Sequence, residues 1–230
     1  MTKFRLLIST LCLTLVSTQA FAKERIVVFP ASTDFPAATS ELNIVNQTLL
    51  AQLNTKDYKA LPVTFTDPRS IELIDYLVDN TASESDKADV RREFVAQLKE
   101  QVNFTFAIFT SVINRPAKFK RGKIIWDDTR KHLVLSGSLK TQYRGDITEQ
   151  LNQESMTGKG MKDADYNALS LKLDVYDSEG TLIEVKKIGI AVPYTFDTNR
   201  KQFRTKKTLF FEERDLEFLQ KNIAKILEKL

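Results

Sequence analysis

The stretch LSLKLDVY, from Leu169 to Tyr176, alternates apolar and polar side chains, and this period of two is typical of a β-strand. The DSEG sequence that follows, Asp177 to Gly180, favours a turn because aspartate and glycine are preferred turn residues. Leu182 to Val192 then predicts a strand that pairs back. We expect one face of this hairpin to be buried, which requires a sheet with other elements packed on it.

The first half of the chain predicts strands and helices in alternation. Apolar runs at Arg25 to Pro30, Tyr58 to Phe65 and Phe104 to Ile113 predict three strands, the last of them central. Asp79 to Asp89 is acidic and polar, which predicts a solvated loop running into a helix start. Apolar residues at helical spacing predict three amphipathic helices. The first has inward positions at Leu42, Val45, Leu49 and Leu53, and the second, after an Asp67-Pro68 start, at Ile71, Ile74, Leu77 and Val78. The third has inward positions at Val90, Phe94, Leu98 and Val102.

The second half predicts long hairpins. Lys118 to Tyr143 predicts one, with a strand at Lys123 to Trp126, a turn at Asp127 to Arg130 and a returning strand at His132 to Lys140. Gly145 to Asp165 has few apolar residues and no clear period, so we expect a mobile excursion there.

The chain ends in a predicted amphipathic helix opened by Glu212, Glu213 and Asp215, since acids at a helix start suit its dipole. Together the elements predict an α/β fold, or α+β as the alternative: a mixed sheet with helices packed on it, long β-hairpins in the second half and a C-terminal amphipathic helix. We expect residues 23–230 to form a single domain, with a basic hairpin and the mobile excursion at about 115–165.

Residues 1–22 have the pattern of a secretory signal peptide. Lys3 and Arg5 precede an apolar run from Leu6 to Val16, and Ala20-Phe21-Ala22 is a small-x-small cleavage signature. The apolar run is about half of the roughly 20 residues that a spanning helix needs, so we expect cleavage and no transmembrane span in the product. The mature chain is predicted to begin at Lys23 and to reach the periplasm, or the exterior as the alternative.

Cleavage would also change the charge and the chemistry of the chain. Loss of Lys3 and Arg5 lowers the formal net charge from +4 to +2, which weakens any case for nucleic acid as a partner. Cys12 is the only cysteine, so the mature chain would have neither a disulfide nor a catalytic thiolate.

The remaining motifs predict no catalytic residue, no metal and no cofactor. His132 is the only histidine, which excludes sites that need two imidazoles. Asp127 and Asp128 are adjacent acids that a turn explains better than a glycosidase pair. Asp79 to Asp89 lacks the spacing of a calcium loop, and Gly158-Lys159-Gly160 lacks the context of a phosphate loop.

One local cluster of positive charge stands out within the predicted hairpin. Its candidate binding residues are Lys118, Lys120, Arg121, Lys123, Trp126, Arg130 and Lys131. A basic hairpin with an aromatic residue at its tip would bind an anionic partner, such as a lipid head group, a peptidoglycan strand or an acidic protein face. The alternative is an edge hairpin whose lysines prevent sheet-to-sheet aggregation.

The segments along the chain are RIVVFP (Arg25 to Pro30), a helix, YKALPV (Tyr58 to Val63), DPRSIEL (Asp67 to Leu73), the 104–113 strand, LKLDVYDSEG (Leu171 to Gly180) and a terminal helix. The order of these segments resembles the α/β module of bacterial envelope proteins. These are the curli-secretion lipoprotein, the amino-terminal domain of the Tol-Pal propeller protein and lipoprotein activators of peptidoglycan synthases. The resemblance implies a non-enzymatic assembly or adaptor role. The lipid-bearing cysteine at the mature start is missing and residues 115–165 are extra, so no functional residue carries over.

We therefore expect a non-enzymatic periplasmic binding or adaptor protein, accessory to cell-envelope assembly or secretion, whose partner is an envelope protein or an anionic envelope component. One alternative is an envelope hydrolase whose carboxylates are brought together only by the fold. Another is a structural subunit that oligomerises through exposed strand edges.

Overall fold

The computed structural model describes residues 23–33, 35, 39–56, 58–63, 76, 83–136, 166–197, 199, 202–206, 208–210 and 212–228. The helix predicted after Asp67-Pro68 and the excursion predicted from Gly145 to Asp165 lie outside the described residues. In chain order the described elements are β1 (Glu24–Val28), β2 (Ser32–Thr33), α1 (Thr39–Thr55), β3 (Tyr58–Pro62), α3 (Glu84–Lys99), β4 (Phe106–Lys120), β5 (Lys123–Trp126), β6 (Thr129–His132), β7 (Leu135–Ser136), β8 (Tyr166–Asp177), β9 (Leu182–Ala191), β10 (Tyr194–Asp197), β11 (Gln202–Thr205) and α5 (Glu213–Leu227).

The long strand β4 organises an eight-stranded mixed sheet. Its first residues pair in parallel with β1, which pairs in parallel with β3. On its other side β4 runs antiparallel to β8 over twelve residue pairs, from Phe106 opposite Asp177 to Ala117 opposite Tyr166. Strand β9 then returns antiparallel to β8. The predicted α/β class, mixed sheet and Leu169 to Val192 hairpin are confirmed.

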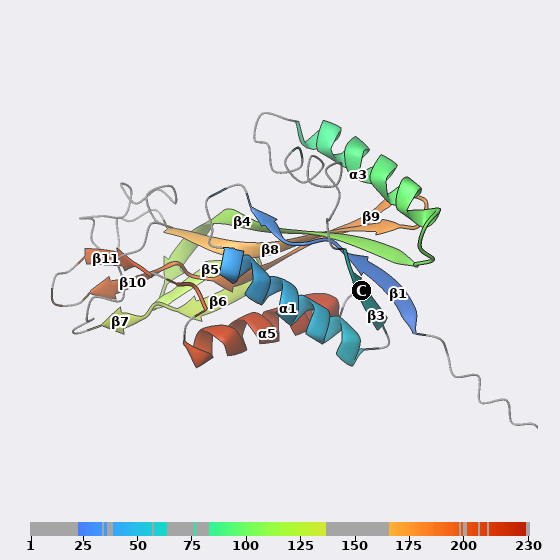
Figure 1. Cartoon of the computed structure of the whole chain (residues 1–230). Helices are drawn as coiled ribbons and strands as arrows, with labels where there is room; N and C mark the ends of the chain where they lie inside the picture. Colours follow the sequence, from blue (N-terminus) through green and yellow to red (C-terminus); the bar gives the residue numbers. More distant parts are fainter. Residues whose placement is uncertain are drawn as a thin grey trace, which may run out of the picture.

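Helices cover both faces of this sheet, giving three layers (Figure 1). On one face α1 and α5 contribute Leu49, Leu53, Leu219 and Ile223 to the largest core cluster, and all four side chains are fully buried. On the other face Val95 of α3 packs in a second cluster, which includes two stacked rings of Phe29 and Phe109 whose centroids lie 4.0 Å apart. The predicted helix packing and the C-terminal amphipathic helix are therefore confirmed.

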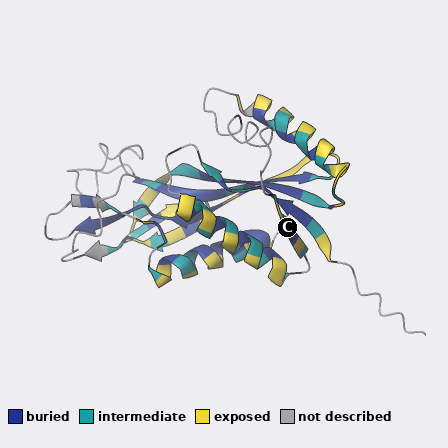
Figure 2. Ribbon diagram, in the orientation of Figure 1, coloured by how far each residue is buried: buried dark blue, intermediate teal, exposed yellow. Residues whose placement is uncertain are grey.

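Strand β8 is buried on both faces, whereas the sequence predicted one buried face. Leu171 and Leu173 face α1 and α5, and the polar residues on either side of this pair, Ser170 and Asp174, are also at most 2% exposed. A strand covered by helices on both sides has no solvated face. Figure 2 shows the centre of the sheet as mainly buried, with some intermediate residues.

Helix α3 differs from its prediction in its start and in burying two charged residues, although Phe94, Leu98 and Val102 pack against the core cluster on that face as predicted. It begins at Glu84, where the Ser83 hydroxyl accepts from the Asp86 amide at 3.1 Å, so the predicted loop is wrong from Glu84 to Asp89. Its most buried positions are Lys87, Arg91 and Val95, while Val90 is half-buried. The cause is the buried Asp174 on β8, which pairs with Arg91 at 3.1 Å and draws a charged residue inward.

The predicted hairpin is a three-stranded meander, here defined as the end of β4 with β5 and β6 (residues 118–132). Strand β4 does not stop near Ile113 but continues to Lys120, and Arg121 and Gly122 turn the chain into β5 with φ of 52° and 76°. Asp127 and Asp128 form the next turn with φ of 34° and 53°. Two successive positive φ angles are typical of the two-residue turns that connect hairpin strands. The predicted four-residue turn is therefore wrong, and the returning strand starts at Thr129.

A small second sheet lies next to the meander. Strand β10 pairs antiparallel with β11 and parallel with β7. Its residues join the inner side of the meander in a separate core cluster rich in aromatic rings, among them Tyr166, Tyr194, Phe196 and Phe203. None of the helices described is long and apolar enough to cross a membrane.

Candidate functional site

The strand register of the meander places its charged residues on one surface. Lys118 lies opposite Ile125, which lies opposite Arg130. Directly opposite residues share a face of a sheet, so these three side chains form one row across the strands. Lys120, Lys123 and His132 form a second row in the same way, two residues further along.

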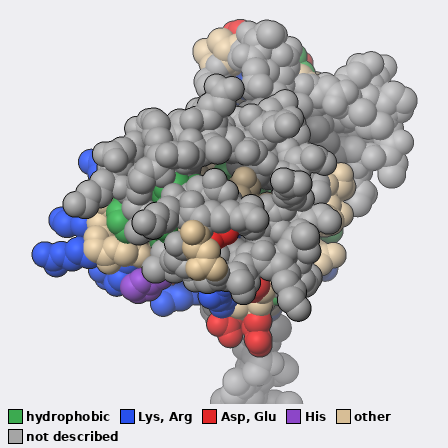
Figure 3. All heavy atoms as spheres, turned by 90° about the vertical axis from the view of Figure 1, so that its left-hand side faces the viewer, with side chains coloured by type: hydrophobic (Ala, Val, Ile, Leu, Met, Phe, Trp, Pro, Cys, Tyr) green, Lys and Arg blue, Asp and Glu red, His purple; other side chains and the backbone are tan. Residues whose placement is uncertain are grey.

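We call the cations of these rows, with the turn residue Arg121, the basic face: Lys118, Lys120, Arg121, Lys123 and Arg130. Four of the five are exposed and Lys123 is half-buried. Ile125 lies between them and is 38% exposed. Figure 3 shows Lys and Arg side chains gathered along one side of this end of the molecule.

The cations of the basic face have no acidic partner among the described residues. The ion pairs of the meander involve Arg115 and Lys131 instead. Lys120 and Lys123 lie directly opposite each other, an arrangement of like charges that destabilises a strand pair. A surface of this kind stabilises a bound anion and offers no nucleophile or general base besides the exposed His132.

Asp127 does not neutralise the basic face because its carboxylate points to other partners. It accepts from Arg115 Nε at 3.0 Å and from the Ser170 hydroxyl at 2.7 Å. The predicted turn role of Asp127 and Asp128 is confirmed, with an added function: Asp127 fastens the β5–β6 turn to β8.

Trp126, which the sequence placed with the binding residues, is 4% exposed and faces inward. Its Nε1 donates to the Leu169 carbonyl at 3.2 Å. The ring lies so close to Gly189 on β9 that a Cβ atom there would be 2.3 Å away. Trp126 therefore holds the meander on the β8–β9 hairpin, and the expected aromatic tip is not formed by this residue.

Lys131 also faces inward, with a side chain that is 11% exposed. Its ammonium group pairs with Asp215 of α5 at 2.5 Å and lies 4.3 Å from the centroid of the Phe218 ring. Asp215 pairs at the same distance with Lys206, so one buried carboxylate is shared by the buried Lys206 and the largely buried Lys131. Lys131 thus joins β6 to α5 and does not belong to the basic face.

Burial and charge act in opposite directions on the pKa values of this buried triad. Burial alone would raise the pKa of Asp215, but Lys206 and Lys131 outweigh it and hold that pKa below its ordinary value of 3.8. Burial lowers the pKa of Lys131, partly offset by Asp215. Nearby, burial raises the pKa of Glu41, whose carboxylate accepts from the Leu209 amide at 2.9 Å.

The spacing of α5 contains a signal for this triad. Asp215 stands four residues before Leu219, and Asn222 and Ile223 follow at helical spacing, so Asp215 occupies the apolar stripe of α5. An acid on such a stripe requires a buried cation. The sequence prediction placed Asp215 only at the acidic start of the helix and missed its burial.

The described residues contain no group of three or more His, Cys, Asp or Glu that could hold a metal ion. His132 is exposed and lies at the end of a row of lysines, without an acid to orient it among the residues described.

Comparison with known proteins gives distant structural likenesses. No family model matches this sequence, and no curated protein matches it. Among solved structures, the chain is similar to the PelC dodecamer from Paraburkholderia phytofirmans (8% identity, 90% of this chain and 86% of that chain, TM-score 0.37). It is also similar to lipoprotein GNA1162 from Neisseria meningitidis (10% identity, 90% of this chain and 99% of that chain, TM-score 0.39). A third similar structure is a neuraminyllactose-binding hemagglutinin homolog from Helicobacter pylori (10% identity, 90% of this chain and 83% of that chain, TM-score 0.33). Similarity at this level does not define a shared function.

Proposed function

We propose that this protein is a non-enzymatic binding or adaptor protein of the bacterial cell envelope, exported by residues 1–22, and that it holds an anionic envelope component or an acidic protein against its basic face. The observation that carries the proposal is a set of five cations on one surface with no acidic partner among the described residues. The signal-peptide pattern supplies the compartment.

Protection of a sheet edge does not account for the whole basic face. Edge protection concerns strands with an unpaired side, and Arg130 on β6 fits that description. Lys123 lies on β5, which pairs with β4 on one side and β6 on the other. A lysine on a strand paired on both sides does not protect an edge, so an anionic partner is the better explanation for Lys123.

A hydrolase is less well supported. The adjacent acids of the meander turn do not face across a cleft, since Asp127 is engaged by Arg115 and Ser170. A cavity between β1, β3 and the end of α1 has no carboxylate among its described lining residues. A glycosidase needs two carboxyl groups facing each other across a substrate.

The test combines crosslinking in cells with paired charge variants. A photoreactive p-benzoylphenylalanine at position 125, in the middle of the basic face, should capture the partner in illuminated cells, and mass spectrometry of the adduct identifies it. Lys120→Glu/Lys123→Glu should reduce the adduct at least tenfold, because it replaces two neighbouring cations by anions. Lys187→Glu/Lys221→Glu, which reverses two exposed lysines elsewhere, is the matched control and should leave the adduct unchanged.

An adduct that survives the Lys120→Glu/Lys123→Glu change would contradict the proposal, and so would equal loss in both double variants. Thermal unfolding of each variant shows whether a loss reflects binding or folding. Both double variants concern side chains outside the buried clusters, so we expect melting temperatures close to that of the unchanged protein.

A further inference from the structure

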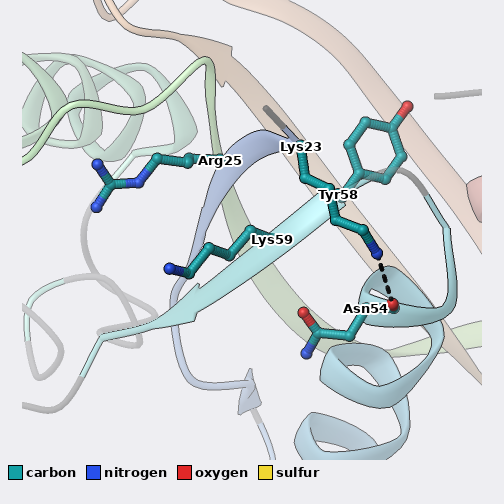
Figure 4. Close-up of a pocket in the computed structure, with 5 residues that line it drawn as sticks. All are labelled: Lys23, Arg25, Asn54, Tyr58 and Lys59. Carbon is teal, nitrogen blue, oxygen red and sulfur yellow. Dashed lines mark hydrogen bonds between the residues drawn. The ribbon is translucent and has the colours of Figure 1, made fainter. Parts of the chain in front are cut away.

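A cavity of about 500 Å³ opens where β1, β3 and the end of α1 meet. It is lined by Lys23, Arg25, Asn54, Tyr58 and Lys59. Three of these five lining residues are cations, and none of the five is an acid. Figure 4 shows Arg25 and Lys59 extending side by side in the same direction.

The strand register forces two of these cations together. Arg25 on β1 lies directly opposite Lys59 on β3. Like charges in directly opposite positions destabilise a strand pair unless a counter-charge lies between them. Neither side chain has an acidic partner in the part of the chain that the structure describes.

Arg25 has a further unmet requirement. Its Nε is buried and has no hydrogen-bond partner among the described residues. A buried guanidinium nitrogen without an acceptor is unusual, because most buried polar atoms in proteins have a partner. An oxyanion in the cavity would contact the terminal nitrogens of the same guanidinium and would offset its unpartnered Nε by charge.

The remaining lining residues hold the cavity in shape. Lys23 Nζ donates to the carbonyls of Asn54 and Lys56, at 3.4 and 3.0 Å, and so joins the residue before β1 to the end of α1. Asn54 Oδ1 accepts from the Ala60 amide at 3.0 Å, which joins α1 to β3. Cleavage after Ala22 would also leave a free α-ammonium group on Lys23, a fourth positive charge at the same cavity.

We propose that this cavity binds a small molecule through a phosphate or carboxylate group, held between the Arg25 guanidinium and the Lys59 ammonium. Guanidinium and ammonium groups form short, charge-assisted hydrogen bonds with such oxyanions. A volume of about 500 Å³ is within the range of pockets for small organic ligands. The inference does not depend on the basic face, which lies at the other end of β4, beyond its pairing with β1.

The test follows the Arg25 Nε–Hε signal in ¹H–¹⁵N spectra of the exported protein while inorganic phosphate replaces chloride at constant ionic strength. We expect a saturable shift of this signal, because an oxyanion bound to the guanidinium changes the electronic environment of Nε. Glycerol 3-phosphate and phosphatidylglycerol vesicles, titrated in the same way, distinguish a free phosphate ester from a lipid head group.

Two variants and a control complete the experiment, with signals of β1 and β3 amides as the readout. Lys59→Gln and Arg25→Gln should each weaken phosphate binding at least tenfold, whereas Lys187→Gln on β9 should not change it. A non-saturating shift up to high phosphate concentration would overturn the proposal, as would equal weakening in Lys187→Gln, which indicates a general charge effect. If the Lys59→Gln and Arg25→Gln variants keep their melting temperatures, their weaker phosphate binding does not result from unfolding. If they also keep the crosslink at position 125, the cavity and the basic face are independent sites.

Discussion

At the scale of single residues, the contact between Trp126 and Gly189 decides how the meander sits on the sheet. The ring N–H of Trp126 donates to the Leu169 carbonyl on β8, and the ring contacts the backbone of β9 at Gly189. Any side chain at position 189 would collide with the ring. Glycine is thus required at position 189 because the Trp126 ring approaches its backbone closely. Its φ is not in the left-handed region, so backbone conformation is not the reason.

Gly189→Ala should destabilise the fold by about 1–3 kcal/mol, the usual cost of overpacking a core. Because Trp126 is the only tryptophan, its emission should shift to the red as the ring is displaced toward water. Urea unfolding followed by tryptophan fluorescence measures both effects. Gly122→Ala is the matched control: nothing lies near its Cβ, but its φ of +76° costs an alanine about 1 kcal/mol, with no change in emission. Unchanged emission in Gly189→Ala would contradict the close contact.

At the scale of elements, the buried triad of Lys131, Asp215 and Lys206 ties β6, the segment before α5 and α5 itself together. Its stability depends on pH in a definite direction. The pKa of Asp215 is lower in the folded protein than its ordinary value of 3.8, so its contribution is present above about pH 4 and is lost as the pH falls through the lowered pKa. Glu41, whose pKa is raised, contributes in the opposite sense, and its share falls as the pH rises above about 4.5.

Asp215→Asn should cost about 3–5 kcal/mol at pH 7, because Lys131 and Lys206 would be buried without a counter-charge. It should also flatten the acid side of the stability profile, measured by urea unfolding between pH 3 and 7. Where Asp215→Asn fails to fold, Lys131→Met/Asp215→Leu/Lys206→Met removes all three charges and should fold, since apolar replacement of a buried ion group is often neutral. If the free energy of unfolding of Asp215→Asn falls as steeply with decreasing pH as that of the unchanged protein, the result would contradict the role of the triad.

Strands in which apolar and polar residues alternate were predictable from the sequence. Elements whose position depends on buried charged residues were not. The LSLKLDVY pattern gave the β8–β9 hairpin with its turn, and helical spacing gave α1 and α5. The charged part of the inward face of α3 was missed because Lys87 and Arg91 are residue types that normally face solvent, whereas both are buried here and Arg91 pairs with Asp174 on β8. The length of β4 was missed because Arg115-Pro116 resembles a strand end.

The candidate site was predictable in composition but not in orientation. Lys118 and Lys120 alternate with Phe119, which already indicates which side of β4 faces outward. A two-residue turn after Lys120 then puts Lys123 outward and Trp126 inward. The residue types predicted a longer turn at Asp127 to Arg130, and without the correct turn the faces of β5 and β6 cannot be assigned.

At the scale of the whole molecule, the two candidate anion sites lie at opposite ends of one sheet, and the described face between them is covered by helices. This arrangement suits an adaptor that contacts two anionic groups at once. The other expected alternative, association through strand edges, stays a prediction. Leu182, Ile183 and Val185 on the outer strand β9 are 43–51% exposed and would be the residues to examine.

Export is the premise of the proposed function, and it has its own test. We expect protein recovered from the periplasm to begin at Lys23, as shown by intact mass and N-terminal sequencing. Ala22→Arg should block processing because the cleavage signature requires a small residue, whereas Ala22→Ser should be processed normally. A periplasmic protein that retains residues 1–22, or equal processing of both variants, would refute the cleavage site.

The parallel pairing of β1 with β4 has a mechanical consequence. Partners bound at the two ends of the sheet would pull along the axis of β4. One partner would load β1 and β3, and the other would load the end of β4 with β5. Tension in that direction shears the β1–β4 pairing, so its hydrogen bonds share the force instead of opening one after another. A connector between two envelope components would therefore resist stretching best along the line that joins its two sites.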